Sequence, residues 1–348
     1  MNQPLVYDLD FDSLKNLLTA WGEPAYRAQQ IWQGLYQHLW TSPDEFTNMP
    51  KTLREKLAAE LRWDALKPDI VVQSKDGETV KTLFRLPDER EIEAVLMRYS
   101  DRRTLCISSQ SGCAMGCVFC ATGQMGFKRH LTSGEIVAQV IYYARKLKDQ
   151  SEQVTNVVLM GMGEPFHNYD NTLAAIDRLN DPKGFNLGAR RFTISTVGLV
   201  PMIRKFANEK RQVNLAISLH AANNSERSAL LPVNRKYPIE EVIEACRYYV
   251  EKTSRRVTFE WALIRGENDT PETAQELARL LKGLMCHVNV IPLNPTKKYP
   301  GQATTRGRAQ AFCDVLTKAG IPCTIRIRRG IDIQAGCGQL ASRETESN

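Results

Sequence analysis

The stretch Cys113-Ala-Met-Gly-Cys117-Val-Phe-Cys120 places three cysteines within eight residues of one loop. An apolar run at 104–110 precedes this loop and has the character of a strand. After the loop, Thr132-Ser-Gly-Glu135 has the capping-box pattern that starts a helix. The cysteines are therefore expected on a connection between a strand and a helix.

Strands and helices alternate through the rest of the chain. Further apolar runs predict strands at 154–160, 191–196, 213–219, 257–264 and 287–293. Helices are predicted at 132–148, 171–180, 199–209, 238–252, 271–283 and 305–319. Six such units indicate an α/β fold with a parallel sheet, a partial (βα)6 barrel of the TIM type, whose ligands bind at the carboxyl ends of the strands.

The segments outside the barrel are assigned by pattern. Residues 1–75 are predicted as a small helical accessory domain, because apolar positions recur at helical spacing from 12 to 66. Two strand-like runs, 79–86 and 91–97, predict a hairpin within a connector at 76–100. The barrel then takes 101–340, and the polar stretch 341–348 is expected to be a frayed tail.

Composition limits the classes of function. The chain has 348 residues and a net charge of +7, which is compatible with a polyanionic partner. Its apolar runs are too short to span a bilayer, and Asp8, Asp10 and Asp12 near the start do not fit a secretory signal. We expect a cytoplasmic protein with no membrane contact. Nine cysteines indicate metal or thiol chemistry more than a disulfide framework.

Three thiolates on one loop favour an iron-sulfur cluster. Structural zinc sites normally use four ligands, and three thiolates would leave a catalytic zinc poorly Lewis-acidic. A 4Fe-4S cluster held by Cys113, Cys117 and Cys120 keeps one iron open for another ligand. The spacing resembles the radical S-adenosylmethionine (SAM) superfamily, in which that iron binds SAM and an electron cleaves it to a 5'-deoxyadenosyl radical.

Polar groups at predicted strand ends are candidates for binding SAM. The stretch Met160-Gly-Met-Gly163-Glu164-Pro165 resembles the glycine-rich SAM motif of the superfamily, with Glu164 as an acceptor for the ammonium group. Each of the other candidates, taken alone, could equally be a turn cap or a ligand contact. They are Ser195, Ser218, Leu219, His220 and Asn294.

Four stretches resemble the RlmN/Cfr family of RNA adenosine methyltransferases over nearly the whole chain. They are 104–110, 119–126, 160–165 and 335–340. The resemblance implies methylation of carbon 2 of an adenosine in 23S ribosomal RNA and of a tRNA adenosine beside the anticodon. Cfr-type enzymes methylate carbon 8 instead, but 124–127 and 164–170 are RlmN-like.

The same resemblance assigns three further residues. Cys337 corresponds to the methyl carrier, Cys106 to its transient disulfide partner, and Glu93 to the proton acceptor. Two SAM molecules would be consumed per turnover. Without the resemblance, the two cysteines would be read as small buried apolar residues and Glu93 as a solvated charge. Cys246, Cys286, Cys313 and Cys323 are expected to be structural, and His130, His167 and His287 are not expected to bind metal.

The expected partners are RNAs and a reductant. We expect 23S rRNA before ribosome assembly is complete, tRNA, an electron donor such as flavodoxin or ferredoxin, and a monomeric enzyme. Any phosphate contacts would come collectively from basic clusters. These lie at 102–103, 128–130, 190–191, 255–256, 297–298 and 326–329.

Two other classes of function remain open. A radical SAM enzyme acting on a small molecule or peptide would need no Cys106–Cys337 pair. A non-catalytic RNA-binding module with a cluster or zinc would need no SAM-binding strand ends.

Overall fold

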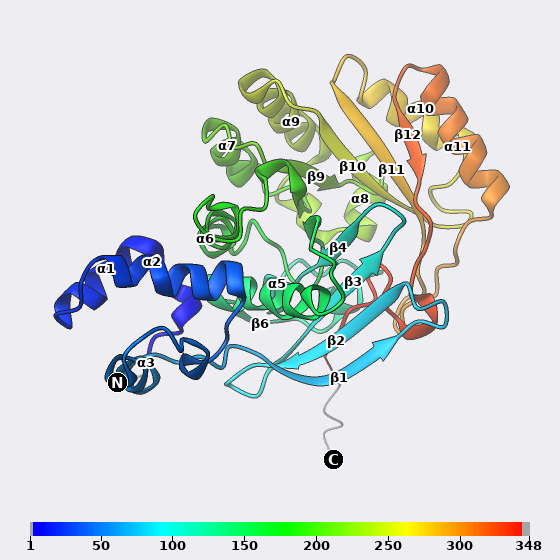
Figure 1. Ribbon diagram of the computed structural model, residues 1–348. Coiled ribbons are helices and arrows are strands. Elements are labelled where there is room, and N and C mark those ends of the chain that lie inside the picture. The colour runs from blue at the N-terminus through cyan, green and yellow to red at the C-terminus, as the bar shows by residue number, and fades with distance from the viewer. Residues whose placement is uncertain (1–2, 343–348) are drawn as a thin grey trace.

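One open ten-stranded sheet organises the protein, whose computed structural model describes residues 3–342 (Figure 1). The strand order is β1-β2-β3-β4-β7-β8-β9-β10-β11-β12, and every pair from β4 onward is parallel. The parallel strands are β4 Arg103–Cys106, β7 Asn156–Leu159, β8 Phe192–Thr196, β9 Asn214–Ser218, β10 Val257–Leu263, β11 Cys286–Pro292 and β12 Cys323–Ile325. The prediction of a partial α/β barrel is confirmed, and the structure adds β12 to the six expected strands.

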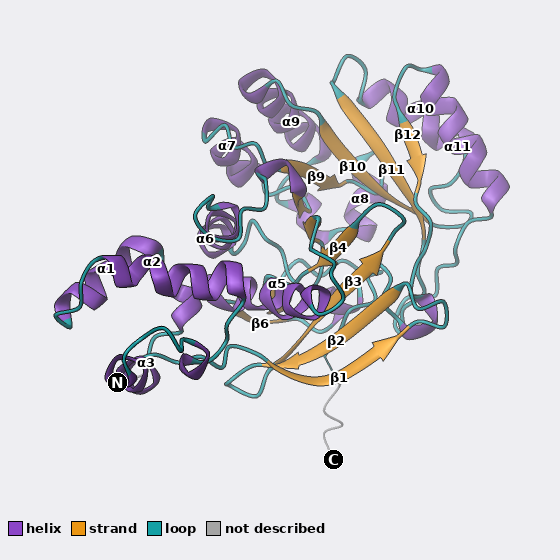
Figure 2. Cartoon of the chain, viewed as in Figure 1, coloured by secondary structure: helices purple, strands orange, loops and turns teal. Residues whose placement is uncertain are grey.

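Helices cover the outside of the parallel strands (Figure 2). They are α5 Ser133–Lys148, α6 Tyr169–Asn180, α7 Val200–Asn208, α8 Asn224–Leu230, α9 Ile239–Thr253, α10 Pro271–Leu280 and α11 Arg306–Lys318. At the start of α5 the Thr132 hydroxyl accepts from the Glu135 amide and the Glu135 carboxylate accepts from the Thr132 amide, so the predicted capping box is present. This helix fixes the far end of the cysteine loop.

Three antiparallel strands extend the sheet beyond β4. They are β1 Lys67–Gln73, β2 Thr79–Arg85 and β3 Glu91–Arg98. The predicted hairpin is present as β2 and β3, but it is more than a connector, because β3 pairs directly with β4. A separate two-stranded ribbon, β5 Gln110–Gly112 with β6 Phe127–His130, encloses the cysteine loop and the short helix α4 Ala121–Gln124.

The N-terminal helices form a layer beside the barrel (Figure 1). They are η1 Val6–Asp8, α1 Phe11–Ala20, α2 Tyr26–Gln33, η2 Gly34–His38, η3 Pro43–Glu45 and α3 Lys51–Glu60. Trp32 is 2% exposed and its indole N–H donates to Asp181 after α6 at 2.9 Å, which ties this layer to the barrel. Among residues 3–342, no helix has the length and apolar character needed to cross a membrane.

Candidate active site

The carboxyl ends of the parallel strands surround a cavity that contains the cysteine loop, here called the cluster cavity. Nine of the residues predicted from sequence line it, together with Cys337. These nine are Cys113, Cys117, Cys120, Gly163, Glu164, Ser195, Ser218, His220 and Asn294. The sequence thus identified one wall from segments that are far apart in the chain, because parallel strands end at the same edge of a sheet.

Leu219 is the exception among the predicted SAM contacts. It is fully buried in the apolar core and does not line the cluster cavity. Its side chain packs into the apolar core at the end of β9, whereas Ser218 and His220 line the cavity. Its N–H donates to the Glu260 carbonyl at 3.1 Å.

The three loop cysteines are nearly enclosed by protein. Burial raises the pKa of Cys113 to about 12 and raises that of Cys117 well above its usual value, so a positive centre is needed to hold them as thiolates. Among the described residues, no three His, Cys, Asp or Glu side chains converge enough to hold a single metal ion. A four-iron cluster is larger than a single ion and is bound by thiols that lie farther apart than the ligands of one ion.

Arg227 lies beneath the cysteine loop and was not predicted from sequence. Its side chain is fully buried and donates to the Val197 carbonyl and to Asn234 Oδ1. Burial lowers its pKa to about 10, while the neighbouring Cys117 acts in the opposite direction. A buried cation here offsets the negative charge of the thiolates.

The glycine-rich loop after β7 approaches the cysteine ribbon closely. Gly163 has a φ of +106°, and a Cβ added there would lie 2.6 Å from the Gln110 Cβ. The Gln110 side chain accepts from the Glu164 N–H at 2.8 Å, and its amide contacts His130 and His167. Glycine is required here for both conformation and space.

Glu164 is buried at the floor of the cluster cavity. Its carboxylate accepts from the Phe166 and Val197 amides at 3.0 and 2.9 Å. Burial still raises its pKa to about 7. A cationic ligand group would stabilise the ionised form.

His220 has a structural contact within the wall. It has a φ of +61°, and its Nδ1 accepts from the Ala262 N–H at 2.9 Å. Burial lowers its pKa to about 3, so the ring is neutral at physiological pH. Its ring also meets the edge of Phe119 from the cysteine loop.

Two oxygens on the wall have no hydrogen-bond partner among the described residues, the buried Asn294 Oδ1 and Glu260 Oε2. Asn294 Nδ2 donates to the Cys337 carbonyl at 3.0 Å, so its oxygen remains as an acceptor. SAM carries ammonium and hydroxyl donors that suit such acceptors. The cavity therefore offers thiols that fit a 4Fe-4S cluster and hydrogen-bond acceptors that fit SAM.

A second cavity, the thiol cavity, adjoins the first and contains both predicted reactive cysteines. Cys106 at the end of β4 and Cys337 both line it, while Met160, Asn294 and Cys337 line both cavities. Cys337 is exposed and lines both cavities, and burial by the surrounding protein raises its pKa to about 11. Burial raises the pKa of Cys106 to about 12.

Arg326 and Glu260 are two further site residues that sequence reasoning missed. Arg326 Nη1 lies 3.6 Å from Glu260 Oε2, and Asn289 donates to the other carboxylate oxygen at 3.0 Å. Arg326 lowers the pKa of both Cys106 and Cys337 against the larger effect of burial. A single acid within the apolar run at 257–264 was the available signal.

Glu93 occupies a third cavity, here called the Glu93 cleft, which Lys81, Gln124, Gln334 and Ala341 also line. Its side chain is 8% exposed and forms an ion pair of 2.8 Å with Lys81. Burial raises the pKa of Glu93, and Lys81 opposes this effect. The expectation of a solvated acid, which sequence alone favoured, is therefore wrong.

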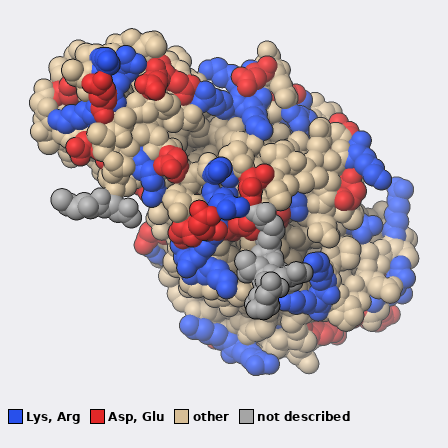
Figure 3. Space-filling model, turned by 90° about the horizontal axis from the view of Figure 1, so that it is seen from below, with Lys and Arg blue, Asp and Glu red and all other residues tan. Residues whose placement is uncertain are grey.

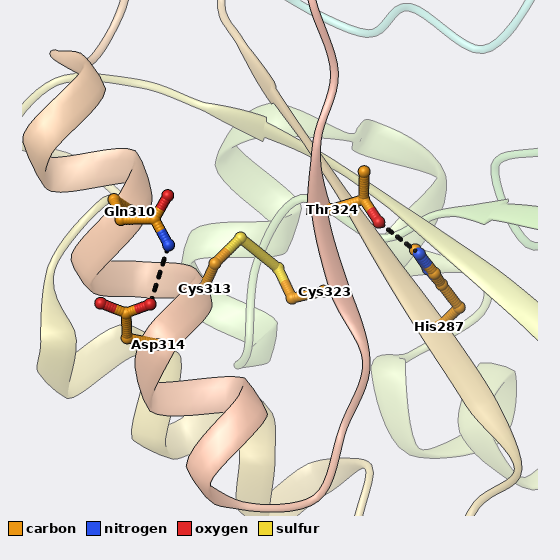
Figure 4. Close-up of a disulfide and its surroundings, with 6 residues drawn as sticks. All are labelled: His287, Gln310, Cys313, Asp314, Cys323 and Thr324. Atoms are coloured by element: carbon orange, nitrogen blue, oxygen red, sulfur yellow. Dashed lines mark hydrogen bonds between the residues drawn. A yellow bond between two sulfur atoms is a disulfide. The ribbon is translucent and has the colours of Figure 1, made fainter.

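The remaining cysteines lie outside these cavities. Cys313 in α11 and Cys323 in β12 form a disulfide, which the sequence did not predict (Figure 4). Cys246 and Cys286 are buried in the core, as expected of structural cysteines.

The basic clusters are partly neutralised within the protein. Arg103 pairs with Glu152, and Arg129 pairs with both Asp88 and Glu135. On the face shown in Figure 3, Lys and Arg groups alternate with acidic groups and do not form one continuous basic surface. RNA contact would therefore depend on several separate positions.

Comparison with known proteins decides the family. The profile of the Radical SAM superfamily matches residues 107–281, and that of the ribosomal RNA large subunit methyltransferase N-terminal domain matches residues 6–62. A probable dual-specificity RNA methyltransferase RlmN of Chloroflexus aurantiacus is 49% identical over 99% of this chain and 94% of its own length. The chain belongs to the RlmN family.

A further curated relative and a solved structure support this assignment. The dual-specificity RNA methyltransferase RlmN 1 of Myxococcus xanthus is 51% identical over 96% of this chain and 93% of its own length. A crystal structure of a radical SAM methyltransferase from Sphaerobacter thermophilus matches with a TM-score of 0.95 and 53% identity, covering 97% of this chain and 99% of that one. Membership in the radical SAM superfamily implies SAM and a 4Fe-4S cluster as cofactors.

Proposed function

We propose that this RlmN-family chain methylates carbon 2 of an adenosine in 23S rRNA and of a tRNA adenosine next to the anticodon. Relatives at about half identity are named dual-specificity RNA methyltransferases, which supports both substrates. The observation that carries the proposal is the thiol cavity, where Cys106 and Cys337 meet beside the cluster cavity.

The cluster cavity has the residues that the proposal needs for its cofactors. Cys113, Cys117 and Cys120 would ligate the 4Fe-4S cluster, and Gly163, Glu164, Ser195, Ser218, His220 and Asn294 would contact SAM. Leu219 would contribute through its backbone, since its side chain is in the core. Bound together, cluster and SAM supply a carbon-centred radical by one-electron cleavage of SAM.

Cys337 would serve as the methyl carrier. Its thiolate would take the methyl group of one SAM molecule, forming a sulfur–methyl bond as the sulfonium bond breaks. A second SAM would serve as the radical source, giving two per turnover. Arg326 beside the thiol favours the thiolate that this displacement requires.

Cys106 and Glu93 would complete the reaction. The S-methyl group would first give one hydrogen atom to the radical, its carbon would join the adenine ring, and one electron would return from this adduct to the centre that supplied it. The Cys106 thiolate would then attack the Cys337 sulfur, so that the sulfur–carbon bond breaks, its electron pair stays with the base, and a proton completes the new methyl group. The electron donor would afterwards reduce the Cys106–Cys337 disulfide. Glu93 would accept the proton that leaves the ring carbon. Because Glu93 faces a different cavity from the two thiols, the base would have to reach the boundary between them.

We further propose a division of labour along the chain. The helices within residues 1–75 would bind RNA by shape, although 67–73 form strand β1 of the sheet, and residues 101–340 would carry the cofactors and both reactive cysteines. The hairpin within 76–100 would contribute Glu93 to the site as well as connect, and of the tail at 341–348 only residues 341–342 lie within the described part. The enzyme would act in the cytoplasm as a monomer, on rRNA before assembly is complete. Flavodoxin or ferredoxin would supply electrons.

The test is anaerobic reconstitution with iron and sulfide, followed by incubation with SAM, reductant and RNA. Mass spectrometry should find a methyl group on Cys337 and 2-methyladenosine in both RNAs. Cys337→Ala should abolish RNA methylation, whereas Cys246→Ala, a buried cysteine outside the cavities, should leave it intact. An unmethylated Cys337 in an enzyme that cleaves SAM would refute the carrier role and favour a small-molecule substrate. 8-Methyladenosine would instead indicate Cfr-type chemistry.

A further inference from the structure

Lys81 and Glu93 lie on the same face of the hairpin formed by β2 and β3. Lys81 pairs with Val95 across the two strands, and Glu93 is two residues from Val95. Diagonal neighbours of this kind are within reach of long side chains. The Lys81 ammonium lies 2.8 Å from Glu93 Oε1.

Both side chains also contact the Cys337 segment, defined here as residues 334–341. Lys81 Nζ donates to the Gln334 carbonyl at 3.2 Å. Glu93 Oε2 accepts from the Ala341 N–H at 2.9 Å. One ion pair therefore fastens the segment on both sides of Cys337, three residues before it and four residues after it.

Contacts with the barrel hold the part of the segment from Gly336 onward, whereas the Gln334 and Ala335 amides donate only to the nearby Ile331 and Gly330 carbonyls. The Ala121 N–H donates to the Gly338 carbonyl at 2.8 Å, and Thr122 donates to the Leu340 carbonyl at 2.6 Å. Asn294 binds the Cys337 carbonyl. Position 334 depends on Lys81 for its carbonyl contact, and Gln334 itself has a φ of +52°, in the left-handed region.

A purely structural fastening would not need charges here. Lys81 and Glu93 side chains are 13% and 8% exposed, and a buried ion pair is often no more stable than apolar packing. An ionised acid at the wall of an open cleft is instead what a proton acceptor requires. A charged Lys81 is explained if it serves two purposes: it keeps Glu93 ionised, and it holds the Cys337 segment in place.

We propose that Lys81 is a positioning residue that holds Glu93 and the Cys337 segment together, so that the proton acceptor and the methyl carrier keep a fixed relation. This inference rests on the proposed roles of Cys337 and Glu93. The charged groups that act on Glu93 are Lys81 from β2 and Glu91 from its own strand, and burial raises its pKa. Loss of Lys81 therefore favours the protonated acid, which cannot accept a proton.

The test compares Lys81→Met with Lys81→Arg in the full chain. Lys67→Met makes the same change at an exposed lysine on the neighbouring strand β1 and serves as the control. The first readout is hydrogen exchange of the peptide 334–341 without cofactors. Lys81→Met should accelerate this exchange by at least about tenfold, because it removes a hydrogen bond from a charged donor. Lys81→Arg should stay close to the unmodified chain.

The second readout is RNA methylation as a function of pH. In Lys81→Met the acid limb of the profile should move to higher pH, and Lys81→Arg should restore it. Unchanged exchange of 334–341 in Lys81→Met would refute the fastening, and an unmoved acid limb would refute the effect on Glu93.

If Lys81→Met does not fold, Glu93→Gln replaces it, because it keeps an acceptor for Ala341 but removes the charge that Lys81 binds. Exchange of 334–341 should then still accelerate, and no acceleration would overturn the proposal. Because exchange is measured without RNA, a failure of the proposed function is seen separately.

Discussion

Arg326 and Glu260 form an ion pair across the boundary between the thiol cavity and the cluster cavity, with 3.6 Å between Arg326 Nη1 and Glu260 Oε2. Glu260 lines the cluster cavity and Arg326 lines the thiol cavity. The pair thus places one positive charge beside both reactive cysteines while its carboxylate faces the SAM side.

The charge of Arg326 should control the reactivity of Cys337. Replacing it with Met removes the influence that lowers the thiol pKa, so burial acts unopposed. Alkylation of Cys337 by iodoacetamide at pH 8 should slow roughly threefold to tenfold, because only the thiolate reacts. Peptide mass spectrometry of the anaerobic chain without cofactors measures the rate. Arg326→Lys retains the charge and should react nearly as fast as the unmodified chain; equal rates in Arg326→Met would contradict the assignment.

Gly163 should be intolerant of any side chain. In Gly163→Ala the new Cβ would lie 2.6 Å from Gln110, at a backbone φ of +106°. The loop must shift, and the dissociation constant for SAM should rise by at least about tenfold. Isothermal titration of the reconstituted protein measures it. Gly188→Ala, which meets no atom within 4 Å, is the control and should bind SAM normally.

Glu164 should give the cofactor-free protein a distinctive pH dependence. Its pKa rises from 4.5 to about 7 on folding, so between these values the folded chain holds a proton that the unfolded chain has lost. The contribution of Glu164 to the free energy of unfolding should therefore fall by about 3 kcal/mol as pH rises through this window, whereas the lowered pKa of buried His220 acts in the opposite direction. Urea unfolding at several pH values measures the slope.

The pH dependence of unfolding in Glu164→Gln should differ from that of the unmodified chain by this contribution, whereas Glu244→Gln, at an exposed position in α9, should keep the dependence of the unmodified chain. The same pH dependence in Glu164→Gln and in the unmodified chain would contradict the assignment.

The Cys313–Cys323 disulfide should add stability without affecting catalysis. The two residues are 10 positions apart, and closing such a loop contributes about 3 kcal/mol by chain entropy. The double variant with serine at both positions should melt at a lower temperature than the oxidised chain, and reductant should abolish the difference. Calorimetry measures both. RNA methylation should be unchanged, since neither residue lines the three cavities.

The sequence predicted the elements whose signals are local. The cysteine spacing, the capping box at Thr132 and the six long apolar runs each depend on neighbours within a few residues, and each is present in the structure. Strand β12 escaped detection because it has only three residues and follows Pro322. A strand of that length is recognisable only through its partner β11.

The parts that were missed depend on register and tertiary contact. Lys81 meets Glu93 only because β2 and β3 pair in one particular alignment, which no pattern along the chain reveals. Arg326 lowers the pKa of Cys106 because the end of β12 and the end of β4 lie on the same cavity, although the two strands do not pair among the described residues. Leu219 was predicted to contact SAM because it lies between Ser218 and His220, but its side chain lies in the apolar core while theirs line the cluster cavity.

The open edge of the sheet has a mechanical consequence. Strand β12 does not pair with β1, β2 or β3 among the described residues, and the chain that follows β12 bridges this gap, with Asp332 accepting from the Lys75 amide and Gln334 from Lys81. The segment that closes the gap between β12 and the first strands is therefore the segment that carries Cys337. Any movement that widens this gap to admit a large substrate also displaces the Cys337 thiol. Entry of the substrate and movement of the methyl group are therefore coupled.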